Sequence, residues 1–152
     1  MKYAQSTQVS SEKSKAEIER LLIRYGASSF VAGWHGNQAA ISFELHGRRI
    51  KFLLPLPNKA DREYTHTPGR GNRRSEAEAY KAWEQATRQK WRALALVCKA
   101  KLEAVESGIT TFEDEFMAHI VMPDGKTVGE HARPLIESAY QSGKVAALLP
   151  GW

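Results

Sequence analysis

The sequence predicts an α+β fold, in which a three-stranded antiparallel meander packs on one long α-helix, with a short N-terminal helix and C-terminal helices completing the core. Three runs, at 29–34, 39–45 and 48–54, alternate apolar and polar residues, as strands with one buried face do. Residues 75–108 instead repeat apolar side chains at three- and four-residue steps, which is the period of one helix face. The long helix is therefore expected to lie on the apolar face of the meander.

The long helix has a start signal, a stop signal and an apolar stripe. Ser75 with Glu78 forms a capping box, and Gly108 offers a left-handed stop. At roughly 1.5 Å per residue the rod is about 50 Å long, whereas a domain of this size is about 40 Å wide, so the helix kinks or its first turns project. The stripe consists of Tyr80, Trp83, Thr87, Trp91, Leu94, Cys98, Leu102 and Val105.

The two halves of this stripe lead to different expectations. Trp91, Leu94 and Cys98 are expected to face the sheet and to be nearly fully buried. Tyr80 and Trp83 lie in the first three turns and would form an exposed apolar patch on a projecting arm, which monomers normally avoid. The N-terminal half of the helix is therefore expected to be a surface for self-association, giving a homo-oligomer, or for another partner.

The N-terminal part of the chain predicts one short helix. Residues 1–12 are polar and have no period, which indicates a disordered lead-in to a single domain at 13–152. Ser14 with Glu17 predicts a capping box for an amphipathic helix at 15–25.

The C-terminal part predicts two more helices. Thr110 with Glu113, and Thr127 with Glu130, fit the capping-box pattern. The last residues, 144–152, are apolar and contain a Pro-Gly pair, so they are expected to dock in extended form on the body. The sequence shows no internal repeat and no second domain.

Composition limits the possible roles. The net charge of +5 over 152 residues favours an anionic partner, although only weakly. Cys98 is the single cysteine, so no intrachain disulfide and no cysteine-based zinc site can form, and a reducing compartment is expected. The N-terminus lacks the apolar segment of a signal peptide, and the longest apolar run, at 94–98, is too short to cross a bilayer. No membrane partner is expected.

The connection at 55–74 is the most informative loop. It begins with Pro-Leu-Pro, which ends the third predicted strand, and it shows no apolar period. Long connections without structure are uncommon in compact domains and are usually either functional or disordered. Two acidic residues oppose five cations, giving a local charge of +3; the cations are Lys59, Arg62, Arg70, Arg73 and Arg74.

Several segments together resemble a family of small proteins encoded by tailed bacteriophages and prophages, which has no assigned activity. These segments are SEKSKAEIER (11–20), GRRIKFLLPLP (47–57), WRALALVCKAKLEAVESGITTFEDEF (91–116), AHIVMPDGKTVGEHARP (118–134) and ALLPG (147–151). The resemblance covers nearly the whole chain but brings no catalytic or ligand residues with it. It implies a setting, namely the cytoplasm of a host bacterium and a role in phage DNA metabolism, host takeover or counter-defence.

The loop cations and the cationic middle of the long helix, which includes Arg88 and Arg92, are expected to form an electropositive stripe. Tyr80 and Trp83 are then available for base stacking. Charged loops and helix faces are most often merely solvated, however, and aromatics on a helical stripe are most often buried. The same stripe could also meet an acidic protein surface.

A metal site is a weaker hypothesis. Glu113, Asp114, Glu115 and His119 lie on neighbouring helical turns, and a ligand set could be built from them. Acidic residues in a first helical turn are favoured by the helix dipole in any case, and no HExxH pattern or nucleophile motif occurs. No metal, cofactor or catalytic residue is predicted, and an enzyme is the less favoured hypothesis.

The function expected from the sequence is non-enzymatic binding of DNA or RNA in phage DNA metabolism. The alternative is an inhibitor of a host or defence protein, similar in role to an anti-CRISPR, that acts by protein–protein binding. In both cases the expected contact residues are Lys59, Arg62, Arg70, Arg73, Arg74, Tyr80, Trp83, Arg88 and Arg92.

Overall fold

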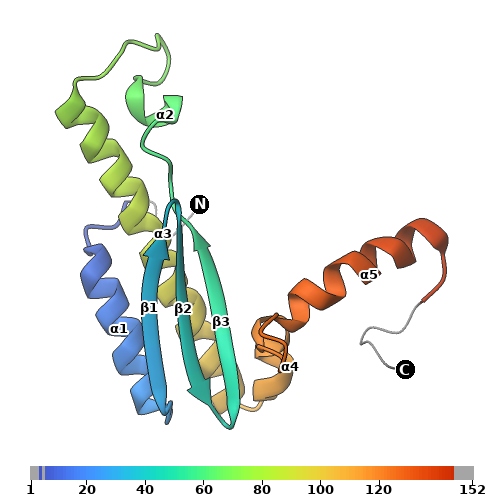
Figure 1. Cartoon of the computed structure of the whole chain (residues 1–152). Helices are drawn as coiled ribbons and strands as arrows, with labels where there is room; N and C mark the ends of the chain where they lie inside the picture. The colour runs from blue at the N-terminus through green and yellow to red at the C-terminus, as the bar shows by residue number, and fades with distance from the viewer. Residues whose placement is uncertain (1–3, 5, 146–152) are drawn as a thin grey trace.

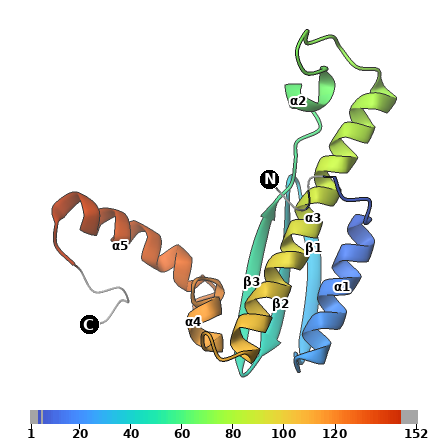
Figure 2. The same ribbon diagram turned by 180° about the vertical axis from the view of Figure 1, so that it is seen from behind.

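The structure is a computed structural model that describes residue 4 and residues 6–145. It has the predicted α+β architecture, with a three-stranded antiparallel sheet of order β1-β2-β3 and helices α1 and α3 side by side on one face of that sheet (Figures 1 and 2). The elements are α1 (Ser11–Arg24), β1 (Ser29–His35), β2 (Gln38–Leu45), β3 (Arg48–Pro55), α2 (Arg62–Thr65), α3 (Glu76–Glu106), α4 (Phe112–Phe116), the 3-10 helix η1 (Met117–His119) and α5 (Val128–Ser142).

The core forms between the sheet and α3, as predicted. Phe43 pairs with Phe30 on one side and with Ile50 on the other, so the three apolar side chains lie on the same face. Trp91, Leu94 and Cys98 are 3%, 6% and 1% exposed. Their burial is confirmed, and each large apolar side chain removed from water in this way stabilises the fold by about 1.5–3 kcal/mol.

Helix α3 begins and ends at the predicted signals. The Ser75 hydroxyl accepts a hydrogen bond from the Glu78 N–H at 3.2 Å. Gly108, just beyond the end of the helix, has a left-handed φ of +80°. The first turns of α3 extend past the end of the sheet (Figure 2). The loop at 56–75 lies beside them.

Helix α1 begins one turn earlier than predicted. The Ser10 hydroxyl accepts from the Lys13 N–H at 3.1 Å and caps the helix. The predicted capping box of Ser14 and Glu17 is therefore wrong, because Ser14 lies fully buried inside the helix. The polar lead-in contributes some packing, since Ala4 is 5% exposed and the Thr7 carbonyl accepts from the Gln85 side chain.

The first C-terminal helix closes the lower end of the core. Its cap is Thr111, whose hydroxyl accepts from the Asp114 N–H at 3.1 Å, so the prediction of Thr110 as the cap is wrong by one residue. Phe112 and Phe116 of α4 are buried, and the Phe116 ring packs edge-on against Phe43 with the centroids 6.1 Å apart.

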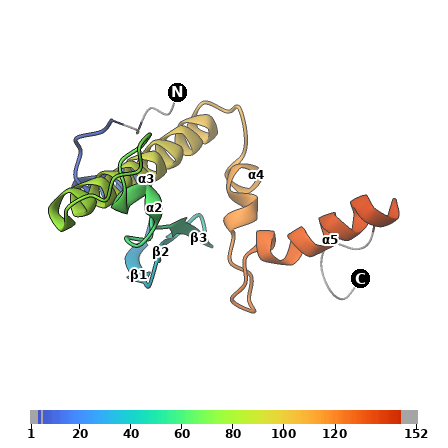
Figure 3. The same cartoon turned by 90° about the horizontal axis from the view of Figure 1, so that it is seen from above.

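Helix α5 has the predicted N-cap, but it does not pack on the core as predicted. The Thr127 hydroxyl accepts from the Glu130 N–H at 3.1 Å. Beyond its first turn the helix leaves the body (Figure 3), and Gly129 is its one buried residue among the side chains described. The expectation that both C-terminal helices complete the core is therefore wrong for α5. The predicted docking of the tail at 144–152 falls almost entirely outside the described residues.

Candidate functional site

The long loop between β3 and α3 is folded rather than irregular. The Thr67 N–H donates to the Asn72 carbonyl at 2.8 Å, and the Arg74 N–H donates to the Thr65 carbonyl at 2.7 Å. These bonds close a hairpin-like turn, and Gly71 at its tip has a left-handed φ of +68°. A Cβ atom at that position would lie 3.0 Å from an Arg62 guanidinium nitrogen, so glycine also permits a close approach.

The start of the loop is fastened to the aromatic end of α3. The Trp83 indole N–H donates to the Pro57 carbonyl at 2.8 Å. The Tyr80 and Trp83 ring centroids lie 5.6 Å apart. The Lys59 ammonium lies 4.4 Å from the Trp83 centroid and 5.5 Å from that of Tyr80, which is within the range of a cation–π interaction. The chain thus covers part of this aromatic pair with its own loop, while Tyr80 remains 51% exposed.

The loop and the first turns of α3 enclose a hollow, which we call the loop cleft. Its volume is about 250 Å³. It brings together five of the side chains that the sequence predicts as contacts. The residues that line it are Lys59, Thr65, Arg73, Arg74, Glu76, Ala79, Tyr80 and Trp83.

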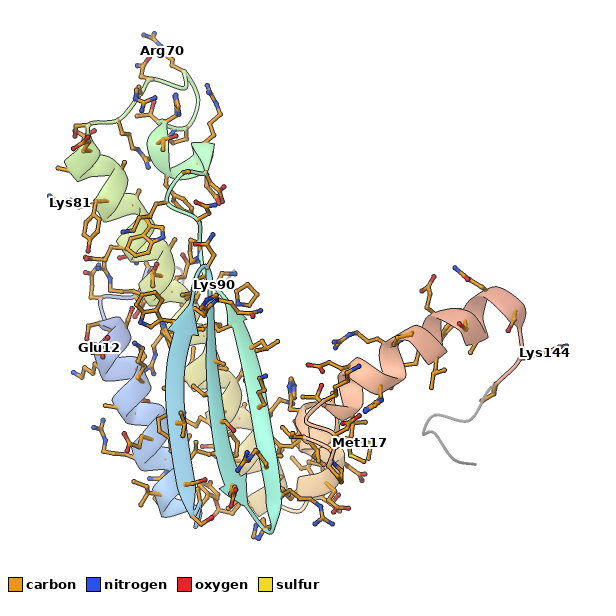
Figure 4. All side chains as sticks on the ribbon, viewed as in Figure 1. Glu12, Arg70, Lys81, Lys90, Met117 and Lys144 are labelled. Carbon is orange, nitrogen blue, oxygen red and sulfur yellow. The ribbon has the colours of Figure 1, made fainter. Side chains whose placement is uncertain are left out.

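The other predicted loop cations lie close to this cleft but outside its lining. Arg70 is at the tip of the loop (Figure 4). The Arg62 guanidinium packs against the backbone of the tip. The Arg74 guanidinium donates to the carbonyls of Tyr64 and Glu63 at 3.2 and 3.4 Å, so this arginine also holds the loop in shape.

The two predicted cations farther along α3 have carboxylate partners. Arg88 forms an ion pair with Glu84 at 2.8 Å. Arg92 is paired with Glu17 across the contact between α3 and α1. The structure therefore does not gather Arg88 and Arg92 with the loop cations.

A second hollow, which we call the tryptophan cleft, adjoins the first. It has a volume of about 570 Å³ and shares Lys59 and Trp83 with the loop cleft. Trp34, at the end of β1, lines it and is 75% exposed. Trp34 is not among the contact residues predicted from the sequence. Trp91 forms another part of the lining, and the Lys15 ammonium lies 4.7 Å from its ring centroid.

The loop arginines contribute to a lowered pKa at His66, after the larger effect of desolvation. Desolvation, followed by the charges of Arg62 and Arg73, lowers the pKa of His66 below its ordinary value of 6.5. The imidazole is therefore neutral at pH 7. An anion placed beside the two arginines would offset their effect and raise this pKa.

Three of the four side chains considered for a metal site, those of Glu113, Glu115 and His119, are used in other contacts. Glu113 pairs with Arg48 at 3.0 Å, and Glu115 pairs with Lys101 at 3.2 Å. The His119 ring stacks on Phe52 with the centroids 4.0 Å apart. Across residues 4 and 6–145, no group of three or more histidine, cysteine or acidic side chains is arranged to hold a metal ion.

No helix among the described residues is long and apolar enough to cross a membrane. No protein-family model, no curated protein and no solved structure matches this chain.

Proposed function

We propose that this chain is a non-enzymatic nucleic-acid-binding protein that holds a phosphate backbone across the loop cleft. The observation that carries the proposal is the meeting of loop cations with the Tyr80–Trp83 pair in one hollow. Proteins that bind single strands combine a positive groove for the phosphates with aromatic side chains on which bases stack. The loop cleft supplies both kinds of group within one connection and one helix end.

The charges of the loop are available to a ligand. Among the residues that the structure describes, no ion pair includes Lys59, Arg70 or Arg73. By contrast, Arg88 and Arg92 already have carboxylate partners, and their charges are largely compensated. Lysine and arginine that neutralise phosphates release counterions, and this release drives salt-dependent binding.

The setting that we propose, phage DNA metabolism in the host cytoplasm, depends on the sequence resemblance alone. A second candidate is an inhibitor of a host or defence protein. One observation favours it: α5 projects from the body with Ile136 48% and Tyr140 87% exposed. Exposed apolar side chains on a projecting helix are a common feature of protein-binding surfaces.

The test compares two variants that lose the same charge. The first combines Lys59→Ala, Arg70→Ala and Arg73→Ala; Arg74 is left intact because its guanidinium holds the loop. Each lost phosphate contact lowers the slope of log K against log salt by roughly 0.9 on duplex and 0.7 on single strands, so we expect a slope flatter by about 2 to 3 units. Anisotropy titrations should begin at about 50 mM salt, because binding without base readout has a Kd of about 10⁻⁴ to 10⁻⁶ M at physiological salt.

The control variant combines Arg20→Ala, Arg24→Ala and Lys99→Ala, three cations of α1 and the second half of α3 that line one hollow away from the loop. We expect it to change the slope by less than about one unit. Equal flattening in both variants would show that the loop is not the site. If the unmodified protein shows no salt-dependent binding at about 10⁻⁴ M, the nucleic-acid proposal is wrong. A protein partner that survives nuclease treatment of a host lysate would then support the inhibitor.

A further inference from the structure

The walls of the tryptophan cleft come from four different parts of the fold. Trp34 comes from the end of β1, Trp83 and Trp91 come from α3, and Leu56 follows β3. The first turns of α1 supply Ser11, Glu12 and Lys15. The cleft volume of about 570 Å³ lies within the range of roughly 300–1,000 Å³ that is typical of small-ligand pockets. The hollow is therefore large enough for one planar ring system with room around it.

Trp34 is exposed although it lies on the core side of the sheet. Along β1, the side chains of Phe30, Ala32 and Trp34 share one face, and Trp34 pairs with Ala39, which is 1% exposed. Phe30 packs against the core, whereas Trp34 is 75% exposed because it stands beside the cleft rather than under a helix. The strand thus places an exposed indole at the edge of the hollow.

The other groups at the cleft fit the rings and edge of a nucleobase. The Lys59 ammonium stands over Trp83 at 4.4 Å and forms no ion pair among the described residues. The Lys15 ammonium stands over Trp91, but its charge is compensated by Glu12, which also lines the cleft and lies 3.1 Å away.

Asn37 and Asn58 line the same hollow. The Asn58 Oδ1 accepts from the Ala60 N–H at 2.9 Å, while its amide NH₂ can donate to the edge of a base, and the side-chain amide of Asn37 can both donate and accept. Nucleobases in single strands are commonly recognised by stacking on aromatic rings together with such edge contacts.

The two clefts are neighbours, because Lys59 and Trp83 belong to the lining of both. A strand whose phosphates contact the loop cations therefore passes beside the tryptophan cleft. A base inside a duplex is stacked and paired, and moving it into a pocket costs the energy of unstacking and unpairing, whereas a base in a single strand is already available.

We infer that the protein prefers single-stranded nucleic acid and that the tryptophan cleft receives one unpaired base, which stacks on Trp34. This inference rests on the proposed function and adds the form of nucleic acid that the site selects. The phosphate contacts of the loop supply affinity for both single strands and duplexes, and the tryptophan cleft supplies the difference between them.

The experiment measures the affinity of the full chain for one mixed-sequence oligonucleotide, first as a single strand and then as a duplex with its complement. Trp34→Ala should weaken single-strand binding by about tenfold, which is within the range measured for the loss of one stacked base. Its duplex affinity should change by less than about twofold, since no base of a duplex enters the cleft. Trp34→Phe keeps an aromatic face and should retain most of the single-strand affinity.

The matched control is Val31→Ala on the same strand. Val31 is 65% exposed, and its position in the strand places it on the opposite face of the sheet. This change should leave both affinities unaltered. Far-ultraviolet circular dichroism of all three variants checks that the sheet and helices are retained.

Two results would overturn the inference in different ways. Equal affinity for the two forms, with Trp34→Ala unchanged while the loop variant still loses binding, would leave the proposed function standing and remove only the preference for single strands. Loss of binding in Val31→Ala as large as in Trp34→Ala would remove the stacking role in the same way. Absence of salt-dependent binding to either form would overturn both proposals.

Discussion

The apolar stripe on α3 runs from Tyr80 to Val105, but its two halves have different surroundings. In the second half, Trp91, Leu94 and Leu102 are buried against the sheet and α1. In the first half, Tyr80 and Trp83 are covered only in part, by Lys59 and the start of the loop. The same helical period thus produces a core at one end and a surface at the other.

The lengths of the elements explain this difference. Helix α3 has 31 residues and is about 46 Å long, whereas β2 has 8 residues and spans about 27 Å. The apolar stripe therefore continues for several turns beyond the last residue of the sheet. The loop that follows β3 covers these turns through polar contacts and a cation, which leaves room for a ligand.

The largest expected change in stability comes from a substitution in the buried half of the α3 stripe. Leu94→Ala removes a side chain that is 6% exposed, so the free energy of unfolding should fall by about 2 to 5 kcal/mol through lost transfer energy and a residual cavity. Val97→Ala, at a position that is 42% exposed on the same helix, serves as the control and should cost less than about 1 kcal/mol. Urea denaturation measures both values. A loss at Leu94 below about 0.5 kcal/mol would contradict the packing described for α3.

A smaller change in stability is expected from a substitution in the first half of the stripe, where α3 projects beyond the sheet. Trp83→Phe removes the hydrogen bond to the Pro57 carbonyl, which should lower stability by about 0.5 to 1.5 kcal/mol. Trypsin should also cleave the loop faster after Arg70, because the bond fastens the loop to α3. Tyr80→Phe is the control, since no hydrogen bond of its hydroxyl is found among the described residues. Unchanged cleavage in Trp83→Phe would mean that other contacts position the loop.

The smallest expected effect is on how the free energy of unfolding depends on pH. Burial, and then the charge of Lys101, lowers the pKa of His119 below its ordinary 6.5. As the pH falls below about 6.5, the unfolded chain takes up a proton at this site before the folded chain does, so stability is present above that pH and is lost below it. His119→Gln should therefore flatten the fall in unfolding free energy between about pH 7 and pH 5. Parallel curves for the two proteins would show that other groups cause the fall.

The fold was predictable from the sequence wherever apolar residues recur with a regular period. The strand and long-helix boundaries agree with the sequence prediction within a residue or two. The N-caps of α1 and α4 were predicted at the wrong residues for the same reason. The capping-box pattern requires Glu or Gln at the third helical residue. Ser10 and Thr111 cap their helices with the hydroxyl alone and are followed there by Lys13 and Asp114, so the pattern selects Ser14 and Thr110 instead.

The site was predictable in its composition but not in its shape. The charge of the loop is evident from Arg70 and its neighbours, whereas the turn that folds the loop depends on backbone bonds without a sequence period. The period-two pattern of β1 places Trp34 on the core side of the sheet, so the sequence predicts that it is buried. It is exposed because no helix covers that end of the sheet, which the sequence pattern does not reveal. A tryptophan directly before a tight His-Gly-Asn turn is the one local signal that points to it.

Amide hydrogen exchange with and without excess single-stranded oligonucleotide tests most directly whether the two halves of α3 have different roles. We expect added protection at 57–83 and at residues 34–38, which are the end of β1, the turn and the start of β2, because these segments line the two clefts. Residues 94–106, which lie beyond both clefts, should exchange at the same rate in both conditions. Protection confined to 94–106 or to α5 would contradict the assignment of the binding surface to the projecting end of the helix.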